Sequence, residues 1–400
     1  MVEESIGTAA PHTSAPDIAA DGLPVLRVAG VDPERRFAGG ESQVLGLTLA
    51  LVNAGHRAEL LCDPAGQLWH RANTAGIQCR PLPIRNSIDA MAGLRLRRLV
   101  AEHRYDIVHF HTSRAHALAP WIIGRGRSGT ARAVVTRRMD YVPNRLFAPW
   151  LYNRAVSGVA AIAPAVADAL VRAGVDRRRI ALVPSGVDCV RFAPPDPAVR
   201  RAARKALGLT CDRVAVGTVG MLEERKGHRY LIGAIASARS QEAGVPDLRC
   251  LIVGEGSLLA ELANQITALE AAGLPSETIR LLGPCDDPYP ILAALDIFVM
   301  PSLAEGLGVA ALEAMACGLP VIASAAGGLR DLVEHQVNGL LVPPGDTPAL
   351  AQSIVELAAD RELRTLMGSA GRARVAADFS MEAMARRTLA LYRDCLGHQL

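Results

Sequence analysis

The sequence predicts an α/β protein made of two doubly wound domains, each built on a parallel sheet, with a cleft between them. Strand-like apolar runs alternate with helical patterns along almost the whole chain, as in βαβ units. The 400 residues are enough for two domains of ordinary size. Half of the residues are hydrophobic but only 4% are aromatic, so the core must be aliphatic and closely packed.

The first half of the chain carries six apolar runs of strand length, separated by helical patterns. The predicted strands are Val25–Val31, Ala58–Cys62, Ile107–His111, Ala133–Thr136, Val159–Ala163 and Ile180–Val183, and the helices include Glu41–Ala54, Ala90–Glu102 and Ala165–Ala173.

A loop rich in turn residues follows, from Pro184 to Asp188 and from Phe192 to Pro197. We therefore expect a disordered tail over 1–22, a first domain over 23–188, a second over 189–378 and a C-terminal helix over 379–400. In the second half, the predicted strands are Val214–Val219, Leu248–Val253, Ile279–Leu282, Ile297–Met300, Val321–Ala323 and Gly339–Val342, and the last helices are Pro348–Ala377 and Met381–Leu396.

Composition limits the compartment. The first 22 residues have neither a basic start nor an apolar run, which argues against a signal peptide. The longest charge-free stretch, Ala314 to Leu329, contains Gly and Pro and is shorter than the about 20 apolar residues that span a bilayer. Eight scattered cysteines without a C-x-x-C pair fit buried thiols in a reducing cytoplasm.

The net charge of +3 is unevenly distributed. Residues 1–190 carry 23 Arg, no Lys and 16 acidic residues, and 12 of these Arg lie within 85–145. A basic cluster of this kind attracts an anionic lipid surface or an anionic acceptor, although solvated helix faces explain it equally well.

The most informative segment runs from Ser302 to Ser324. Glu313 is the one charged side chain between Gly306 and Leu329, and a buried carboxylate is costly unless hydrogen-bond donors face it. Glu305 stands in the preceding loop, and a helix that begins after Gly308 offers unpaired amides to a phosphate. Two acids around a phosphate cradle predict a nucleotide-sugar site. The alternative is a helix-terminal acid and a core Glu paired with an Arg.

A second turn, Gly220 to His228, also follows a strand and opens a helix. Lys226 is one of only two lysines among 43 basic residues, and a compact ammonium at such a turn suits a diphosphate. A cation at a helix start opposes the helix dipole, which weakens the reading of Lys226 as a plain solvated residue.

Weaker signals lie at the same predicted sheet edges. Gly39 and Gly40 bring backbone close to a ligand or form an ordinary turn. His109 and His111 share one face of a strand, where a cleft role and a core role are equally compatible with the sequence. Val253 to Ser257 resembles a dinucleotide fingerprint, but Leu259 replaces its third glycine. No Asp-x-Asp motif is present, so we expect no metal and no cofactor.

Together these motifs resemble the retaining glycosyltransferases of family 4 (glycosyl transferases group 1), which have the two-domain, Rossmann-like GT-B fold. The resemblance extends over roughly residues 24–397. Its strongest part is the Glu-x7-Glu segment from Glu305 to Ser324. The matching motifs also include Arg225-Lys226-Gly227, Gly39-Gly40, Pro184 to Asp188 and Asn338 to Pro343.

The resemblance implies a nucleotide-sugar-binding second domain, an acceptor-binding first domain and a last helix that crosses back onto the first. By position it implies that Glu313 holds the ribose and Glu305 the transferred sugar. It implies that the diphosphate is bound by the backbone of Gly306, Leu307 and Gly308 together with Lys226 and Arg225. The base would contact residues Gly283 through Cys285. The acceptor side of the cleft would be lined by Gly39, Gly40, His111, Arg137 and Arg138.

Two positions depart from the family's pattern. Met221 stands where the family has an Arg after the glycine, and Arg225 is our candidate to replace that diphosphate contact. Arg138 stands where the family has a cleft histidine. An anionic group of the donor or acceptor beside Arg137 and Arg138 would explain the change.

The sequence therefore predicts a metal-independent, retaining glycosyltransferase that uses a nucleoside-diphosphate sugar. Arginines interleaved with Trp121, Tyr141, Phe147, Trp150 and Tyr152 favour a lipid-linked or lipopolysaccharide-type acceptor at the cytoplasmic face of the plasma membrane. A soluble sugar acceptor and a nucleotide-sugar epimerase are the alternatives. A nicotinamide dehydrogenase would need the third glycine, and a nucleic-acid-binding role leaves Glu305, Glu313 and Lys226 unexplained.

Overall fold

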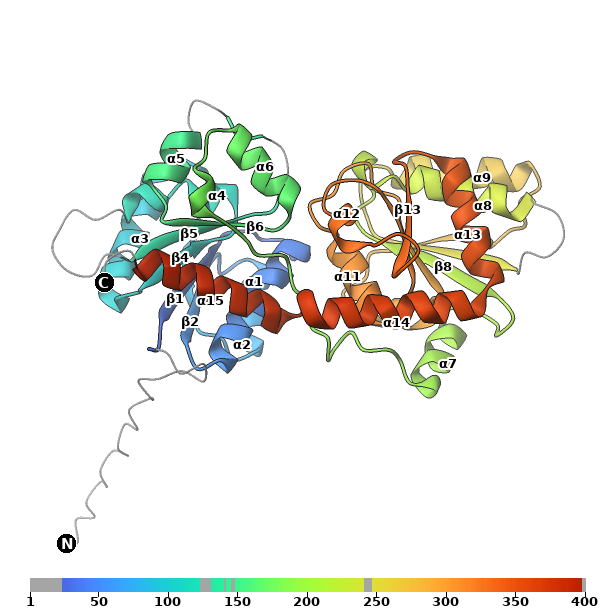
Figure 1. Ribbon diagram of the computed structural model, residues 1–400, viewed down its shortest axis with the longest axis horizontal. Coiled ribbons are helices and arrows are strands. Elements are labelled where there is room, and N and C mark those ends of the chain that lie inside the picture. Colours follow the sequence, from blue (N-terminus) through green and yellow to red (C-terminus); the bar gives the residue numbers. More distant parts are fainter. Residues whose placement is uncertain (1–23, 123–130, 140–141, 145–147, 241–246, 398–400) are drawn as a thin grey trace, which may run out of the picture.

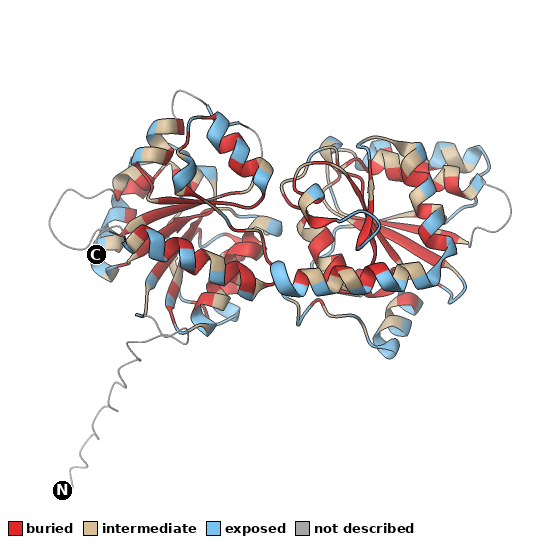
Figure 2. Ribbon diagram, in the orientation of Figure 1, coloured by how far each residue is buried: buried red, intermediate tan, exposed pale blue. Residues whose placement is uncertain are grey.

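The computed structural model describes residues 24–122, 131–139, 142–144, 148–240 and 247–397. They form two α/β halves that lie next to each other along the long axis of the molecule, each with one parallel sheet covered by helices (Figure 1). Buried residues concentrate in the two sheets and on the helix faces that cover them (Figure 2). The predicted fold class is confirmed, and the tail predicted over 1–22 lies outside the described residues.

The N-terminal sheet has the strand order β3-β2-β1-β4-β5-β6-β7, and its neighbouring strands all pair in parallel. Its strands are β1 (Arg27–Asp32), β2 (Arg57–Cys62), β3 (Cys79–Pro81), β4 (Ile107–Phe110), β5 (Arg132–Arg137), β6 (Gly158–Ala161) and β7 (Ile180–Leu182). The helices around it are α1 (Gly39–Asn53), α2 (Gln67–Thr74), α3 (Ala90–His103), α4 (Ser113–His116), α5 (Ala148–Arg154) and α6 (Pro164–Arg172), with short 3-10 turns at Ala119–Trp121 and Arg177–Arg179.

The C-terminal sheet has the order β10-β9-β8-β11-β12-β13 and is likewise parallel. Its strands are β8 (Val214–Val219), β9 (Leu248–Val253), β10 (Ile279–Gly283), β11 (Ile297–Met300), β12 (Val321–Ser324) and β13 (Gly339–Val342). The helices of this half are α7 (Pro197–Ala206), α8 (His228–Ser240), α9 (Leu259–Ala271), α10 (Tyr289–Ala294), α11 (Val309–Ala316), α12 (Leu329–Leu332), α13 (Thr347–Ala359) and α14 (Arg361–Asp378), with a 3-10 turn at Glu224–Lys226. The last helix in the described part of the chain is α15 (Met381–Gly397).

The central strands read as continuous apolar runs because helices cover both faces of each sheet. Every residue of β11 and β12 is buried, for example. The strand order reverses direction between β1 and β4 and again between β8 and β11. Ligands of such sheets bind beyond the carboxyl ends of the strands at these reversals, so the loops after β1, β4, β8 and β11 are the places to look for a site.

The structure differs from the sequence-based expectation in two places. β3 was not predicted because its three residues include Arg80 and Pro81 and form no apolar run. The helix predicted over 348–377 is wrong as a single element, because Asp360 ends α13 and caps α14 by accepting a hydrogen bond from the Leu363 amide (2.9 Å). An N-cap acid starts a new helix without any Gly or Pro to mark the break.

Helix α15 returns to the N-terminal half and packs against α1, β5 and β6 (Figure 1). The two segments that connect the halves pair with each other, since Val187 donates to Phe379 O (2.8 Å) and accepts from the Met381 amide (3.1 Å). The Gln43 side chain of α1 makes two 2.7 Å hydrogen bonds to the backbone of Gly186. Both connections are therefore anchored to the N-terminal half at one point.

Tyr392 of α15 is fully buried, and its hydroxyl lies 2.7 Å from Nδ1 of His109 in β4. We expect Tyr392→Phe to lower the free energy of unfolding by about 1–2 kcal/mol, because a ring nitrogen of the buried His109 loses its partner. Tyr289→Phe is the matched control, since that hydroxyl makes no hydrogen bond to the described residues. Urea unfolding of both variants checks this, and equal stabilities would contradict it.

Candidate functional site

The loop between β11 and α11 carries the predicted donor-binding residues. Gly308 begins α11 with a left-handed backbone (φ 96°), and a Cβ there would lie 2.7 Å from the Leu329 side chain. The amides of residues 306–310 donate to no acceptor within the described part of the chain. Unpaired amides and the positive end of the helix dipole thus coincide, which is the arrangement that binds phosphate.

Close backbone contacts hold this loop in place. A Cβ at Gly327 would come within 1.8 Å of Glu305 O, and one at Gly328 within 2.2 Å of Gly306 O. A Cβ at Gly227 would lie 2.0 Å from Pro301 O, and the Leu303 amide donates to Arg225 O at 2.7 Å. Any side chain at these glycines would displace the backbone, so the loop conformation is set before a ligand arrives.

Lys226 and Glu305 form an ion pair, with their side chains only 13% and 12% exposed. Ser302 Oγ also donates to Glu305 Oε2 at 3.4 Å. The structure therefore brings these two predicted residues together. The ammonium has three N–H groups, so the contact with Glu305 leaves donors for a phosphate oxygen.

Glu313 has no such partner. It lies on α11, half-buried, and its carboxylate makes no hydrogen bond or ion pair with any described residue. Burial raises its pKa to about 7, which the charge of Arg191 partly offsets. Arg191 itself pairs with Asp287 at 2.9 Å. The reading of Glu313 as a core acid locked to an arginine does not hold.

Two further donor-side predictions lie near Glu313. Gly283 ends β10 with φ 74°, and its carbonyl accepts from the Gly254 amide (2.8 Å). Cys285 is exposed, and its pKa is raised by partial burial and by the nearby charges of Asp287 and Glu313. The Arg225 side chain instead pairs with Glu223 (3.0 Å) and is 41% exposed. Its backbone, not its guanidinium, contacts the loop after β11.

The carboxyl edges of the two sheets meet at this loop. A Cβ at Gly306 would lie 2.4 Å from Arg138 O, which follows β5. Gly39, at the start of α1, has Val309 of α11 within 3.8 Å of its Cβ position, whereas Gly40 has open space there. The N-terminal and C-terminal predicted residues are therefore neighbours across the interface between the halves.

The structure adds two acids that the sequence analysis did not single out as site residues. Asp32 ends β1 and is 1% exposed, and Glu41 lies in the first turn of α1 and is 8% exposed. The pKa of Asp32 is raised to about 7, mainly by burial and also by the charge of Glu41, against the opposing effects of the Glu34 amide and the charge of Arg138. The sequence does contain a signal for these two residues, because one acid directly follows the first predicted strand and a second follows Gly39-Gly40.

The two histidines differ. His109 is a core residue, with Nδ1 near Tyr392 Oη and Nε2 2.7 Å from Thr136 Oγ1. His111 is 5% exposed, and its Nδ1 has no hydrogen-bond partner within the described residues. Burial and the charge of Arg138 keep the pKa of His111 well below its usual value, so the ring is neutral. Arg137 is buried and donates to Ser113 Oγ at 3.4 Å.

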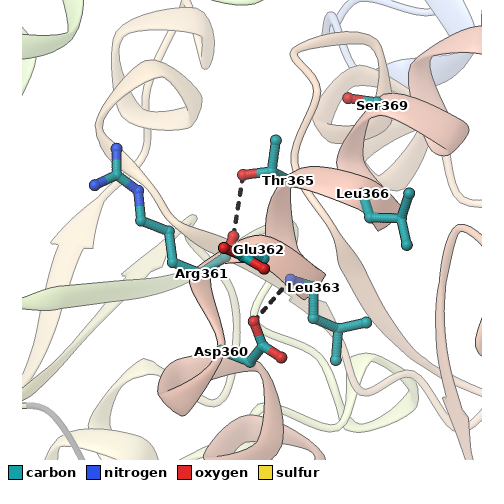
Figure 3. A pocket seen from close by; sticks show the side chains of 7 residues that line it. All are labelled: Asp360, Arg361, Glu362, Leu363, Thr365, Leu366 and Ser369. Carbon is teal, nitrogen blue, oxygen red and sulfur yellow. Dashed lines mark hydrogen bonds between the residues drawn. The ribbon is translucent and has the colours of Figure 1, made fainter.

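A depression of about 820 Å³ lies elsewhere, at the start of α14 (Figure 3). The dashed contacts in Figure 3 are capping and helix-internal hydrogen bonds of Asp360 and Thr365. This depression brings together no group with evident chemistry. In the described ranges, no three His, Cys, Asp or Glu residues are placed to hold a metal ion.

We expect Glu313→Gln to stabilise the protein at alkaline pH. The raised pKa means that ionisation of Glu313 costs stability, a cost that develops as pH rises from 4.5 through about 7. The Gln variant should melt about 3 °C above wild type at pH 8, with the difference shrinking toward pH 4.5. Melting curves across this range, with the exposed Glu356→Gln as control, test it. A Gln variant less stable at pH 8 would contradict it.

Comparison with known proteins gives consistent results. The sequence profile "Glycosyltransferase Family 4" matches residues 37–191, and "Glycosyl transferases group 1" matches residues 213–360. A GDP-mannose-dependent monoacylated alpha-(1-6)-phosphatidylinositol monomannoside mannosyltransferase of Corynebacterium glutamicum is 39% identical over 51% of this chain and 54% of its own length. The D-inositol 3-phosphate glycosyltransferase of Geodermatophilus obscurus is 39% identical over 55% and 48%. The match thus spans about half the length of these relatives.

A longer match is the 2-deoxystreptamine N-acetyl-D-glucosaminyltransferase of Streptomyces fradiae, 31% identical over 81% of this chain and 83% of that protein. Among solved structures, Anabaena HepE in complex with UDP-glucose superposes with a TM-score of 0.78 at 24% identity, covering 91% of this chain and 99% of HepE. A glycosyltransferase from Rickettsia africae gives 0.80 at 21% identity, covering 93% and 99%. The chain belongs to the family 4 glycosyltransferases (glycosyl transferases group 1) and has their GT-B fold.

Proposed function

We propose that this protein is a retaining, metal-independent glycosyltransferase that moves a sugar from a nucleoside-diphosphate sugar to an acceptor hydroxyl in the synthesis of lipopolysaccharide, glycolipid or another envelope glycan. The observation that carries the proposal is the unpaired Glu313 carboxylate on the same helix, α11, whose start presents the unpaired amides of residues 306–310. A protein that keeps an uncompensated acid beside an anion-binding helix end has both halves of a nucleotide site.

Each donor group has a counterpart here. The ribose hydroxyls donate to Glu313, and the diphosphate accepts from the amides after Glu305 and from Lys226. Glu305 contacts the transferred sugar while it holds the Lys226 ammonium in position. The base lies against residues 283–285. No cofactor has a role in this scheme.

The reaction follows from these positions. The bond from the anomeric carbon to the phosphate oxygen breaks first, which leaves an oxocarbenium-like sugar and a diphosphate whose negative charge has grown. Lys226 and the end of α11 stabilise that charge. The acceptor hydroxyl then attacks from the same face, and its proton passes to the leaving phosphate oxygen. The names of relatives support a GDP or UDP sugar as donor, since one uses GDP-mannose and HepE binds UDP-glucose.

The acceptor side has an amphipathic surface that supports a membrane-bound acceptor. Met91 and Leu94 of α3 are 72% and 50% exposed, and Ile88, in the turn just before this helix, is 89% exposed. Arg95 and Arg98 lie exposed on the same helix. Exposed apolar side chains flanked by arginines suit the surface of an anionic membrane, which supports the proposal of a peripheral enzyme at the cytoplasmic face of the plasma membrane.

The aromatic residues contribute less than the sequence suggested. Trp121 packs on Gly93, Tyr152 is buried, and Trp150 remains 54% exposed. Tyr141 and Phe147 lie outside the described residues. No helix in the described ranges is long and apolar enough to cross a bilayer.

A soluble acceptor is the second candidate. The relative with the longest match reported above is named for a small aminocyclitol, 2-deoxystreptamine, and not for a lipid. Membrane binding therefore separates the two candidates.

We expect Lys226→Ala and Glu305→Ala each to reduce sugar transfer at least about 100-fold, because each removes a charge that acts on the departing diphosphate or the sugar. The matched control is Lys205→Ala, which removes the other lysine of the chain from exposed α7. A thermal-shift screen with UDP, GDP, ADP and their common sugars first identifies the donor, and nucleotide release then measures transfer. Wild-type turnover in either site variant would refute these roles.

For the membrane, the triple variant Ile88→Ser, Met91→Ser, Leu94→Ser should bind anionic liposomes about tenfold more weakly than wild type, since about 1 kcal/mol or more of apolar contact is lost. Flotation with phosphatidylglycerol vesicles measures this. Leu366→Ser, at a 68% exposed leucine of α14, is the control and should float like wild type. If the wild-type protein does not float with these vesicles, the result contradicts the membrane-bound acceptor and supports the soluble one.

A further inference from the structure

Three charged side chains converge on the N-terminal side of the interface without forming an ion pair. Asp32 ends β1, Glu41 lies in the first turn of α1, and Arg138 follows β5. Strands β1 and β5 both pair in parallel with β4, so Asp32 and Arg138 lie at the same edge of the sheet, and α1 with Glu41 follows β1. Burial lowers the pKa of Arg138, and the charges of Asp32 and Glu41 counteract that effect. No carboxylate oxygen of the two acids lies within 4 Å of the Arg138 guanidinium among the described contacts.

Each group is left with unused hydrogen-bonding capacity. Asp32 uses one oxygen to accept from the Glu34 amide (3.0 Å), and Glu41 uses one to accept from the Ala38 amide (2.8 Å). The second oxygen of Asp32 has no partner in the described part of the chain, although the residue is 1% exposed. Arg138 makes no hydrogen bond to another described residue. Such groups are costly inside a protein unless a ligand completes them.

The neighbouring histidine gives an independent indication. Nδ1 of His111 is buried and has no hydrogen-bond partner within the described residues. The His111 amide donates to Val31 O (3.1 Å), Nε2 of the ring lies 3.5 Å from the Cβ position of Gly30 in β1, and the charge of Arg138 acts on the imidazole. A neutral imidazole offers one donor and one acceptor, as a hydroxyl does.

The cluster also lies next to the predicted position of the reacting sugar. The Arg138 carbonyl touches Gly306, and Gly39, two residues before Glu41, faces Val309 at the start of α11. The donor loop and this cluster therefore lie on opposite sides of the interface between the sheet edges. The cluster is on the acceptor's side of that interface, because it belongs wholly to the N-terminal half.

The charges decide which acceptor group fits. In their ionised forms, Asp32 and Glu41 repel a phosphate or carboxylate beside Arg138 and so oppose the attraction of its guanidinium. An ammonium group of the acceptor would be repelled by the Arg138 guanidinium. A pair of neighbouring hydroxyls can donate to the carboxylates and accept from the guanidinium at once. Burial also raises the pKa of Asp32 to about 7, so near neutral pH this carboxyl can donate as well as accept.

We propose that Asp32, Glu41 and Arg138, with His111 beside them, form a subsite that binds neighbouring uncharged hydroxyls of the acceptor and excludes an anionic group at this position. This assignment rests on the proposed glycosyltransferase function. It replaces the expectation of an anion beside Arg137 and Arg138. In this arrangement Arg138 is a specificity-determining residue and Asp32 a positioning residue for the hydroxyl that attacks the sugar.

Three cyclitols that differ in charge test the proposal: myo-inositol (neutral), D-inositol 3-phosphate (anionic) and 2-deoxystreptamine (cationic). Saturation-transfer NMR on the full chain, with the nucleoside diphosphate that stabilises it, measures binding of each. We expect the strongest signal from myo-inositol, an about tenfold loss in Asp32→Asn and Arg138→Met, and no loss in Glu34→Gln, an acid two residues away that pairs with Arg114.

Selectivity separates a ligand role from a structural one. Asp32→Asn should raise binding of D-inositol 3-phosphate relative to myo-inositol, which a general loss of folding would not do. Nucleotide-induced melting shifts confirm that each variant is folded. Absence of any myo-inositol signal in wild type, or a signal unchanged in Asp32→Asn, would overturn the subsite. Failure of every nucleotide to stabilise wild type would instead overturn the proposed function.

Discussion

Backbone-to-backbone contact around residues 305–308 is the constraint on which the rest of the structure depends. Gly306 lies against Arg138 O of the N-terminal half, while Gly327 and Gly328 lie against the carbonyls of Glu305 and Gly306. None of these positions has room for a Cβ, so the two sheet edges come closer than side chains would permit. That close approach is what brings a helix start, an ion pair and a buried acidic cluster to one place.

Charge is handled in three different ways around this loop. Lys226 and Glu305 satisfy each other, Glu313 stays unpaired, and Asp32, Glu41 and Arg138 balance one another without direct contact. Ionising a buried, unpaired carboxylate costs stability, which is why burial raises the pKa of both Glu313 and Asp32. Proteins retain unpaired carboxylates of this kind mainly where a bound ligand forms hydrogen bonds to them.

The connections between the halves suit a protein that must bind two substrates. Val187 and Ser380 bridge the two crossing segments, Gln43 anchors them, and α15 buries Tyr392 against β4. The apolar core is also continuous from one half to the other, since Ile162 and Leu307 belong to one buried cluster. The interface is therefore a packed, defined surface on which small shifts of backbone change the space available to a ligand.

The sequence by itself determined the fold class, because parallel strands buried on both faces must read as apolar runs, and β8, β9, β11 and β13 coincide with such runs. It also singled out Glu305, Glu313 and Lys226, since each breaks a local pattern. Short β3 and the break at Asp360 had no comparable local signal. Only the tertiary structure decided that Arg225 pairs with Glu223, that Lys226 pairs with Glu305, and that the charge of Arg138 acts on Asp32 without direct contact. These interactions depend on which strand ends meet in the fold and on the rotamers of long side chains. The spacing of residues along the sequence determines neither of these.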